Sequence, residues 1–169
     1  MPEGIEVEYY RQSALRALNR KVELVETVDQ NYLRDGHSLN DIKDLLEGNT
    51  FEFASRRGKL LVLSASNGTF IGLRFGMTGR LLVDGVSAIE TLEYSSTKNE
   101  PKWDRFTLKF SDGGTLSIRD PRRLGAVQIN PDIEVLGVDL YELTISSLSK
   151  ALGGSSRALK SCLMDQSKI

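Results

Sequence analysis

The stretch LLVLSASNGTFIGLRF (residues 60–75) decides the fold of this chain. Two runs rich in leucine, valine, isoleucine and phenylalanine flank SNG at 66–68. Apolar β-branched and aromatic residues favour strands, and Asn-Gly favours the tight turn of a hairpin. We therefore predict two antiparallel strands, over 60–66 and 69–75, joined by a short turn.

Runs of the same kind surround this hairpin, and SDGG at 111–114 is a second turn signal. Many short strands joined by tight turns are typical of a β-sandwich or a β-barrel. The least regular stretch, 86–104, predicts a longer loop. The further predicted strands are KVELVETV (21–28), TFEFASR (50–56), GRLLVD (79–84), RFTLKFS (105–111), TLSIRD (115–120) and GAVQIN (125–130).

Apolar residues at helical spacing predict four helices. The first covers 3–19, and the second covers 39–47, where Ser38 can cap the helix and Gly48 can end it. After Pro131 the character of the chain changes, and helices are predicted over 143–152 and 155–165. The apolar stripe of the first helix consists of Val7, Tyr10, Ala14, Leu15 and Leu18.

Charge is unevenly distributed over the 169 residues, although the net charge is only −1. Residues 1–48 carry 6 basic and 10 acidic side chains, whereas residues 49–125 carry 12 basic and 8 acidic ones. With one cysteine and one histidine, the chain can form neither an internal disulfide nor a Cys/His metal site. No secretory signal or apolar membrane span is present, so we expect a cytosolic protein.

The basic middle of the chain gathers its charges at predicted turns and strand ends. A solvated surface explains most such runs. Because glycines at these turns allow a close approach of the backbone, a groove that follows phosphates is the alternative that we favour. The three clusters are Arg56, Arg57 and Lys59; Arg74 and Arg80; and Arg119, Arg122 and Arg123.

Two further features have both an ordinary and a functional interpretation. Met77, in FGMTG, could belong to the core, or it could wedge into a base stack beside the arginines. The opening MPEGIEVE could be only a helix start, since proline and acidic residues suit the first turn.

Five motifs resemble, in order and spacing, those of the formamidopyrimidine-DNA glycosylase / endonuclease VIII family. They are MPEGIEVE, RRGKLLVL, LRFGMTGRL, DPRRLG and SSRALKSCLMDQ, the last of which (155–166) is similar to the start of the family's helix–two-turn–helix element. The resemblance implies an α+β fold that is mainly β. It comprises a two-layer antiparallel β-sandwich domain over 1–135, with an N-terminal helix and a second short helix. The first helices of an incomplete DNA-binding domain would then occupy 136–169.

The resemblance also implies a catalytic set of Pro2, Glu3, Glu6 and Lys59. After removal of Met1, the secondary amine of Pro2 would attack C1′ of a damaged nucleotide. A terminal amine has a pKa of about 8, so much of it can be neutral and nucleophilic near pH 7. Glu3 would protonate the sugar oxygen and shuttle protons, Glu6 would be a second carboxylate near the site, and Lys59 would contact the phosphates that flank the lesion.

Other positions match DNA contacts of the family. Met77 would fill the gap left by the flipped base, Arg122 would point toward the orphaned base, and Lys160 would bind phosphate. Arg74 stands where histidine is usual and Leu124 where phenylalanine is usual, and PEGIEVE replaces PELPEVE. The implied DNA-binding set is Arg56, Arg57, Lys59, Arg74, Met77, Arg122, Arg123, Leu124 and Lys160.

The implied function is that of a base-excision-repair DNA glycosylase with AP lyase activity. It would remove oxidised bases through a Schiff base at Pro2 and cleave the strand by β/δ-elimination. We expect it to be a monomer in the bacterial cytoplasm or the nucleus, to act on duplex DNA with a damaged base or an abasic site, and to need no cofactor in this chain. A C-terminal zinc or zincless finger would belong to a longer form. The alternative is a truncated or degenerate relative that binds DNA or a protein partner without catalysis.

Overall fold

The computed structural model of the chain describes residues 2–92, 98 and 100–169. Met1, whose removal the proline chemistry requires, lies outside these residues, as does part of the loop predicted over 86–104. The chain divides into two compact units, Met1–Pro131 and Asp132–Ile169, which we describe separately.

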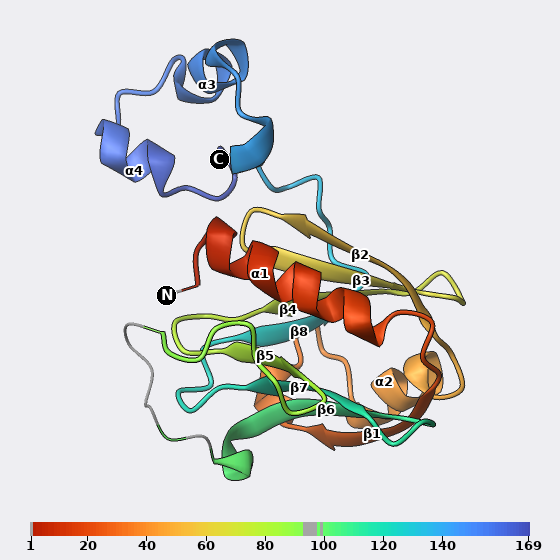
Figure 1. Cartoon of the computed structure of the whole chain (residues 1–169). Helices are drawn as coiled ribbons and strands as arrows, with labels where there is room; N and C mark the ends of the chain where they lie inside the picture. Colours follow the sequence, from red (N-terminus) through yellow and green to blue (C-terminus); the bar gives the residue numbers. More distant parts are fainter. Residues whose placement is uncertain (1, 93–97, 99) are drawn as a thin grey trace. The chain divides into compact units, whose positions relative to one another are not determined.

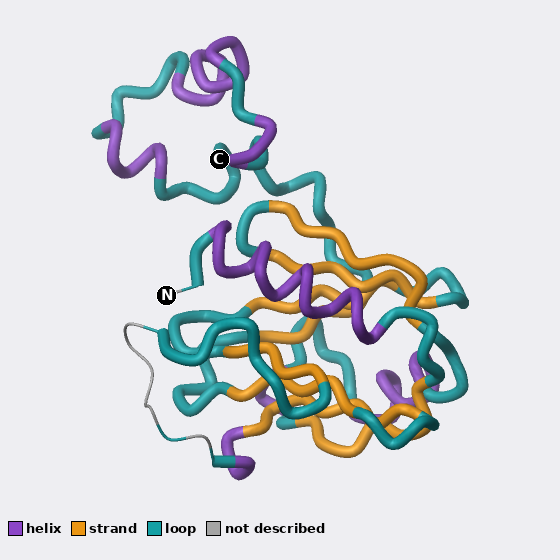
Figure 2. Tube along the Cα trace, in the orientation of Figure 1, coloured by secondary structure: helices purple, strands orange, loops and turns teal. Residues whose placement is uncertain are grey.

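The first unit contains two antiparallel four-stranded sheets, with the strand orders β1-β6-β7-β5 and β2-β3-β4-β8. Figures 1 and 2 show these sheets as two layers, which confirms the predicted sandwich and removes the barrel alternative. The hairpin predicted over 60–75 is β3–β4. The strands are β1 (Val22–Val28), β2 (Phe51–Arg57), β3 (Leu60–Ala65), β4 (Phe70–Arg74), β5 (Arg80–Val83), β6 (Asp104–Phe110), β7 (Thr115–Arg119) and β8 (Ala126–Ile129).

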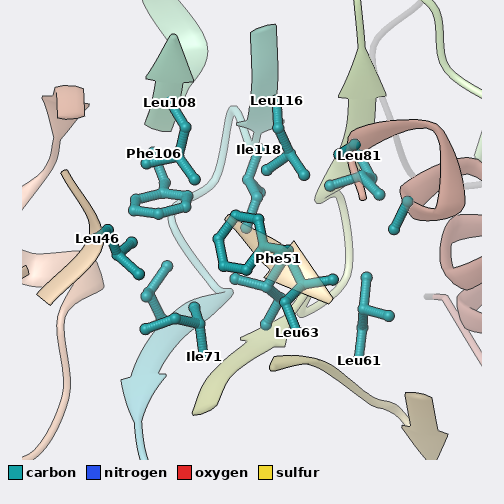
Figure 3. Close-up of a cluster of buried hydrophobic side chains, with 14 of the residues drawn as sticks. Leu46, Phe51, Leu61, Leu63, Ile71, Leu81, Phe106, Leu108, Leu116 and Ile118 are labelled. Carbon is teal, nitrogen blue, oxygen red and sulfur yellow. The ribbon is translucent and has the colours of Figure 1, made fainter. Parts of the chain in front are cut away.

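The core lies between the sheets and follows from the alternation of each strand (Figure 3). Alternate side chains of β3, such as Leu61 and Leu63, face Phe106 and Ile118 of the other sheet, and all four are 0% exposed. Burial of each such side chain contributes about 1.5–3 kcal/mol relative to exposure. This shared core fixes the register of both sheets.

Helix α1 (Gly4–Ala14) packs against β2 and β3 of one sheet and β5 of the other. The helix is shorter than the predicted 3–19. After Ala14 the chain tightens into a short 3₁₀ helix, η1 (Leu15–Ala17), and Leu18 is already extended. Because the helix ends here, Leu15 points outward with 46% exposure and is not part of the buried stripe, which consists of Val7, Tyr10 and Ala14.

Helix α2 (Leu39–Leu46) packs beside β1 and agrees closely with the prediction. Ser38 Oγ accepts a hydrogen bond from the Asp41 backbone N–H at 3.3 Å, as a helix cap does. Gly48 follows the helix with a φ of +86°, a conformation that glycine adopts readily. Two further 3₁₀ turns lie among the described residues of the first unit, η2 (Gln30–Tyr32) and η3 (Pro101–Trp103).

The second unit contains a 3₁₀ turn, η4 (Leu140–Glu142), and helices α3 (Ile145–Leu152) and α4 (Leu159–Leu163). Helix α3 starts later than predicted because Thr144 caps it from an extended conformation. Helix α4 is much shorter than the predicted 155–165, since the backbone of Ala158 is still non-helical, with a ψ of 139°. The assignment of this unit to a helix–two-turn–helix element stays a prediction.

Candidate active site and nucleic-acid interface

Three connections of the first unit meet at one end of the sandwich. In one sheet, Leu60 pairs with Arg74 and Arg74 pairs with Ala126, so the turn before β3, the end of β4 and the loop before β8 lie at the same end. In the other sheet, Arg80 pairs with Arg119. The β4–β5 turn and the β7–β8 loop therefore both cross between the sheets here. We call this region, together with the first turn of α1, the helix-start end (Figure 1).

The first turn of α1 contacts the β2–β3 turn through an ion pair. Lys59 Nζ lies 2.5 Å from Glu3 Oε2, with 25% of the lysine side chain and 53% of the glutamate side chain exposed. Glu6 Oε2 accepts a hydrogen bond from the Glu3 backbone N–H at 2.9 Å, and Pro2 is buried. The structure thus brings together the carboxylates and the lysine that the sequence analysis singled out around Pro2.

A second charge cluster, to which no role was assigned from the sequence, attaches the helix to the same turn. Glu8 accepts hydrogen bonds from Arg11 at 2.7–3.0 Å and from Arg56 Nε at 3.3 Å. The Arg11 hydrogen bonds, assisted by Arg56, hold the pKa of Glu8 below its ordinary value. Arg56 also donates to the Gly58 carbonyl at 2.7 Å, and its side chain is only 5% exposed. Arg56 therefore fixes the turn from inside, while Arg57 is half-buried.

Two arginines that we assigned to the phosphate groove lie inside the fold instead. Arg80 is 4% exposed and donates to the Glu90 carbonyl at 2.8 Å. Arg119 is 7% exposed and binds both oxygens of Asp104 at 2.6 and 2.8 Å. That interpretation was wrong because the fold brings an acceptor 10 residues away in the sequence to Arg80 and one 15 residues away to Arg119. Arg74 is half-buried, its Nε donates to Gln128 Oε1 at 2.9 Å, and burial lowers its pKa.

Met77 and Arg122 meet across the two crossing connections. Arg122 Nη1 donates to the Met77 sulfur at 3.7 Å, and Met77 is half-buried, whereas Arg122 is exposed. Leu124 is 45% exposed. Arg123 instead forms an ion pair with Asp29 at 2.9 Å. Lys160 belongs to the second unit, where it is exposed on α4.

Asp120 organises this end, and it was not among the site residues predicted from the sequence. Its buried carboxylate accepts hydrogen bonds from Tyr32, Thr78 and three backbone N–H groups of the β7–β8 loop. The one available signal was Asp-Pro at the start of a loop, because aspartate commonly accepts hydrogen bonds from the backbone that follows it. Its partners Tyr32 and Thr78 come from segments far away in the sequence.

Among residues 2–92, 98 and 100–169, no group of three or more histidine, cysteine, aspartate or glutamate side chains is arranged to hold a metal ion. In the same described residues, no helix is both long and apolar enough to cross a membrane.

Comparison with known proteins gives one family. The model of the formamidopyrimidine-DNA glycosylase N-terminal domain matches residues 1–127. A formamidopyrimidine-DNA glycosylase of Arabidopsis thaliana is 31% identical over 182 residues, which cover 100% of this chain and 46% of that protein. One from Idiomarina loihiensis is 34% identical over 134 residues, covering 73% of this chain and 45% of that protein. The chain thus spans about half the length of these curated relatives.

Solved structures show the same fold. The Lactococcus lactis Fpg in complex with DNA containing an abasic site superposes with a TM-score of 0.78 at 22% identity, over 99% of this chain and 62% of that one. The wild-type Lactococcus lactis Fpg bound to DNA containing N7-benzyl-Fapy-dG gives a TM-score of 0.77 at 22% identity, over 98% of this chain and 61% of that one.

Proposed function

The chain belongs to the formamidopyrimidine-DNA glycosylase family, and from this premise we propose that it is the catalytic part of a base-excision-repair DNA glycosylase with AP lyase activity. Its substrate would be duplex DNA that contains an oxidised base or an abasic site. It would act as a monomer wherever cellular DNA is held, in the bacterial cytoplasm or the nucleus.

One observation carries the proposal: the ion pair of 2.5 Å between Lys59 and Glu3, immediately beside Pro2. A carboxylate next to a terminal amine can accept and return protons during attack on a sugar. A lysine ammonium at the same point suits a neighbouring phosphate. When DNA enters, Lys59 would exchange the Glu3 carboxylate for a phosphate, which frees Glu3 for proton transfer.

The chemical steps follow from a free Pro2 amine. Its nitrogen attacks C1′ and gives its proton to the Glu3 carboxylate, while the bond between C1′ and the damaged base breaks and the departing base takes up a proton from water. Glu3 then protonates the sugar ring oxygen, so the ring opens and an iminium forms between Pro2 and C1′. This cation acidifies the proton on C2′, whose removal expels the 3′ phosphate by β-elimination. A second elimination releases the 5′ phosphate.

The DNA surface proposed for this reaction comprises Lys59, Arg74, Met77, Arg122 and Leu124. Arg122 is exposed at the helix-start end and can reach beyond the protein surface. Met77 and Leu124 present apolar atoms next to it, which suits a gap left in the base stack. Arg56, Arg123 and Glu8 would hold these loops rather than contact DNA, because their charged groups are engaged within the protein.

Borohydride trapping tests the proposal. The processed protein, with Pro2 verified as its first residue by mass spectrometry, should form a stable cross-link to an abasic duplex, and the cross-linked peptide should map to Pro2. The matched control is the same chain with Met1 retained, which keeps every side chain but converts the Pro2 amine into an amide and should give no cross-link.

Two results would count against the proposal. A cross-link that forms at an equal rate in Pro2→Gly, through a lysine, would remove Pro2 from its role. A processed chain that binds the abasic duplex but never cross-links would favour the alternative of a DNA-binding relative without catalysis.

A further inference from the structure

The carboxylate of Asp120 lies at the start of the β7–β8 loop and is 0% exposed. It accepts five hydrogen bonds, which divide between its two oxygens. Oδ1 accepts from the Thr78 hydroxyl at 2.5 Å and from the Arg122 N–H at 3.2 Å. Oδ2 accepts from the Tyr32 hydroxyl at 3.1 Å and from the N–H groups of Leu124 and Gly125 at 2.8 and 2.9 Å.

The division places two different loops on one oxygen atom. Thr78 directly follows Met77 in the β4–β5 turn, while Arg122 belongs to the β7–β8 loop. Hydrogen bonds to a carboxylate are stronger than those between neutral groups. Oδ1 therefore joins the backbone that carries Met77 to the backbone that carries Arg122, although 45 residues separate them in the chain.

A second observation shows that the two loops form one packed structure. Gly76 has a φ of +57°, and a Cβ added to it would lie 2.6 Å from the Leu124 carbonyl oxygen. The loops thus touch backbone to backbone, at a distance that only glycine permits.

Asp120 is itself held rigidly from other elements. Its carbonyl accepts from Arg105 Nε at 2.8 Å, and its N–H donates to the Trp103 carbonyl at 2.9 Å. Burial raises the pKa of Tyr32 well above its ordinary value, so the Tyr32 hydroxyl remains a donor to Oδ2. The carboxylate therefore provides a fixed point for both loops.

We propose that Asp120 and Thr78 form a buried latch that holds Met77 and Arg122 in one preformed arrangement, so that both side chains enter an opened base stack together. Asp120 is then a positioning residue, since it touches neither DNA nor the reacting atoms. The inference rests on the proposed function for its purpose, but the latch itself is a property of the protein alone. Preforming the pair reduces the ordering cost that two independent loops would incur on binding.

Amide hydrogen exchange on the unbound 169-residue chain tests the latch without DNA. Thr78→Val keeps the shape of the side chain but removes the donor to Oδ1. The backbone amide of Arg122 donates to Asp120 Oδ1, and the Thr78 hydroxyl holds that oxygen in place. Without the hydroxyl, the Arg122 amide should exchange about tenfold faster. Thr78→Ser restores a hydroxyl and should restore slow exchange.

Tyr32→Phe is the matched control. It also removes one hydroxyl donor from Asp120, but from Oδ2, and it leaves the β4–β5 turn untouched. It should speed exchange at Leu124 and Gly125 more than at Arg122. If Thr78→Val leaves the Arg122 amide at its wild-type rate, or if the two variants act alike on all three amides, the latch does not join the loops and the proposal is wrong.

A double-mutant cycle tests what the latch is for. Met77→Ala and Arg122→Ala should weaken binding to an abasic duplex non-additively in the wild-type chain and additively in Thr78→Val. Binding to an undamaged duplex should not change with Thr78. A merely structural role for Thr78 would instead weaken both duplexes alike and leave the coupling intact, which would overturn the proposal. A wild-type chain without preference for the abasic duplex would overturn the proposed function, and hydrogen exchange would then decide the latch alone.

Discussion

The two ends of the sandwich both carry arginines beside turns that contain glycine, yet they use them differently. At the helix-start end, the guanidinium of Arg122 donates to the sulfur of Met77, and among residues 2–92, 98 and 100–169 it forms no ion pair with a carboxylate. At the opposite end, where the β6–β7 turn meets the residues after α1, Arg20 binds two carboxylates at once. An arginine at a turn is therefore available to a phosphate only where no carboxylate of the protein within reach already binds it.

The network around Arg20 is complete in itself. Arg20 binds both oxygens of Asp112 at 2.7 and 2.8 Å and both oxygens of Asp84 at 3.0 Å. Its guanidinium lies 4.5 Å from the centre of the Phe110 ring, and its side chain is 16% exposed. Its fifth N–H donates to the Arg16 carbonyl at 3.3 Å, so every donor faces a partner within the protein and this end offers little to a phosphate.

The largest expected effect on stability comes from replacing a glycine, and it should differ between the two ends. Gly76→Ala at the helix-start end should lower the free energy of unfolding by about 2–4 kcal/mol, because a Cβ there meets backbone atoms in addition to an unfavourable φ. Gly113→Ala, in the β6–β7 turn, should cost only about 1 kcal/mol, since its φ is also positive, at +87°, but nothing lies within 4 Å. Urea unfolding of the two variants measures the difference. Equal losses would mean that the two loops at the helix-start end are not packed together.

Removal of one basic side chain at each end, Lys59 or Arg20, should affect DNA binding and stability differently. Lys59→Ala should reduce the slope of log affinity against log salt by about 0.9 on duplex DNA, because one phosphate contact is lost. Its melting temperature should hardly change, since a partly exposed ion pair contributes little. DNA binding titrated at several salt concentrations, and a melting curve of the same sample, provide both values.

Arg20→Ala is the control for Lys59→Ala, and it should change stability but not DNA binding. It should lower the melting temperature by roughly 5 °C, because a largely buried side chain loses its hydrogen bonds and its ring contact. Its salt slope should match that of the wild type. A reduced slope in Arg20→Ala would place DNA at the opposite end of the sandwich and contradict the site assignment.

Local patterns in the sequence were sufficient for the strands and for α2, because alternation, turn residues and caps act over a few residues. The hairpin around SNG at 66–68 and the Ser38 cap are examples. The end of α1 was not predictable in this way, since apolar spacing continues to Leu18 while tertiary contacts draw that residue toward Phe51.

The candidate site was predictable only in part, for the same physical reason. Motifs pointed to Pro2, Glu3, Lys59 and Met77, which lie in short contiguous stretches. The burial of Arg80 and Arg119 depends on strand register, and the role of Asp120 depends on donors from three separate segments. Such many-body contacts leave no periodic signal in the chain.

The smallest expected effect concerns acid stability at the opposite end. Hydrogen bonds from Arg20 hold the pKa of Asp112 at about 2 and also lower the pKa of Asp84. In the unfolded chain an aspartate has a pKa of about 3.9. A carboxyl whose pKa is lower in the folded state stabilises the fold above the unfolded pKa, and this contribution is lost as the pH falls toward the folded pKa. Asp112 should therefore contribute stability at pH 5 and above, and lose it between about pH 4 and pH 2.

Asp112→Asn removes this titration and should flatten the acid limb of the stability curve. The variant should be less stable than the wild type at pH 6, and the two should converge near pH 2, as measured by urea midpoints across this range. Asp44→Asn, on the exposed side of α2, is the matched control because no ion pair to Asp44 is formed among the residues that the structure describes, and its curve should run parallel to that of the wild type. Should Asp112→Asn also run parallel, the Arg20 network would contribute nothing to the folded state. The difference between the two ends would then depend only on Arg122 at the helix-start end.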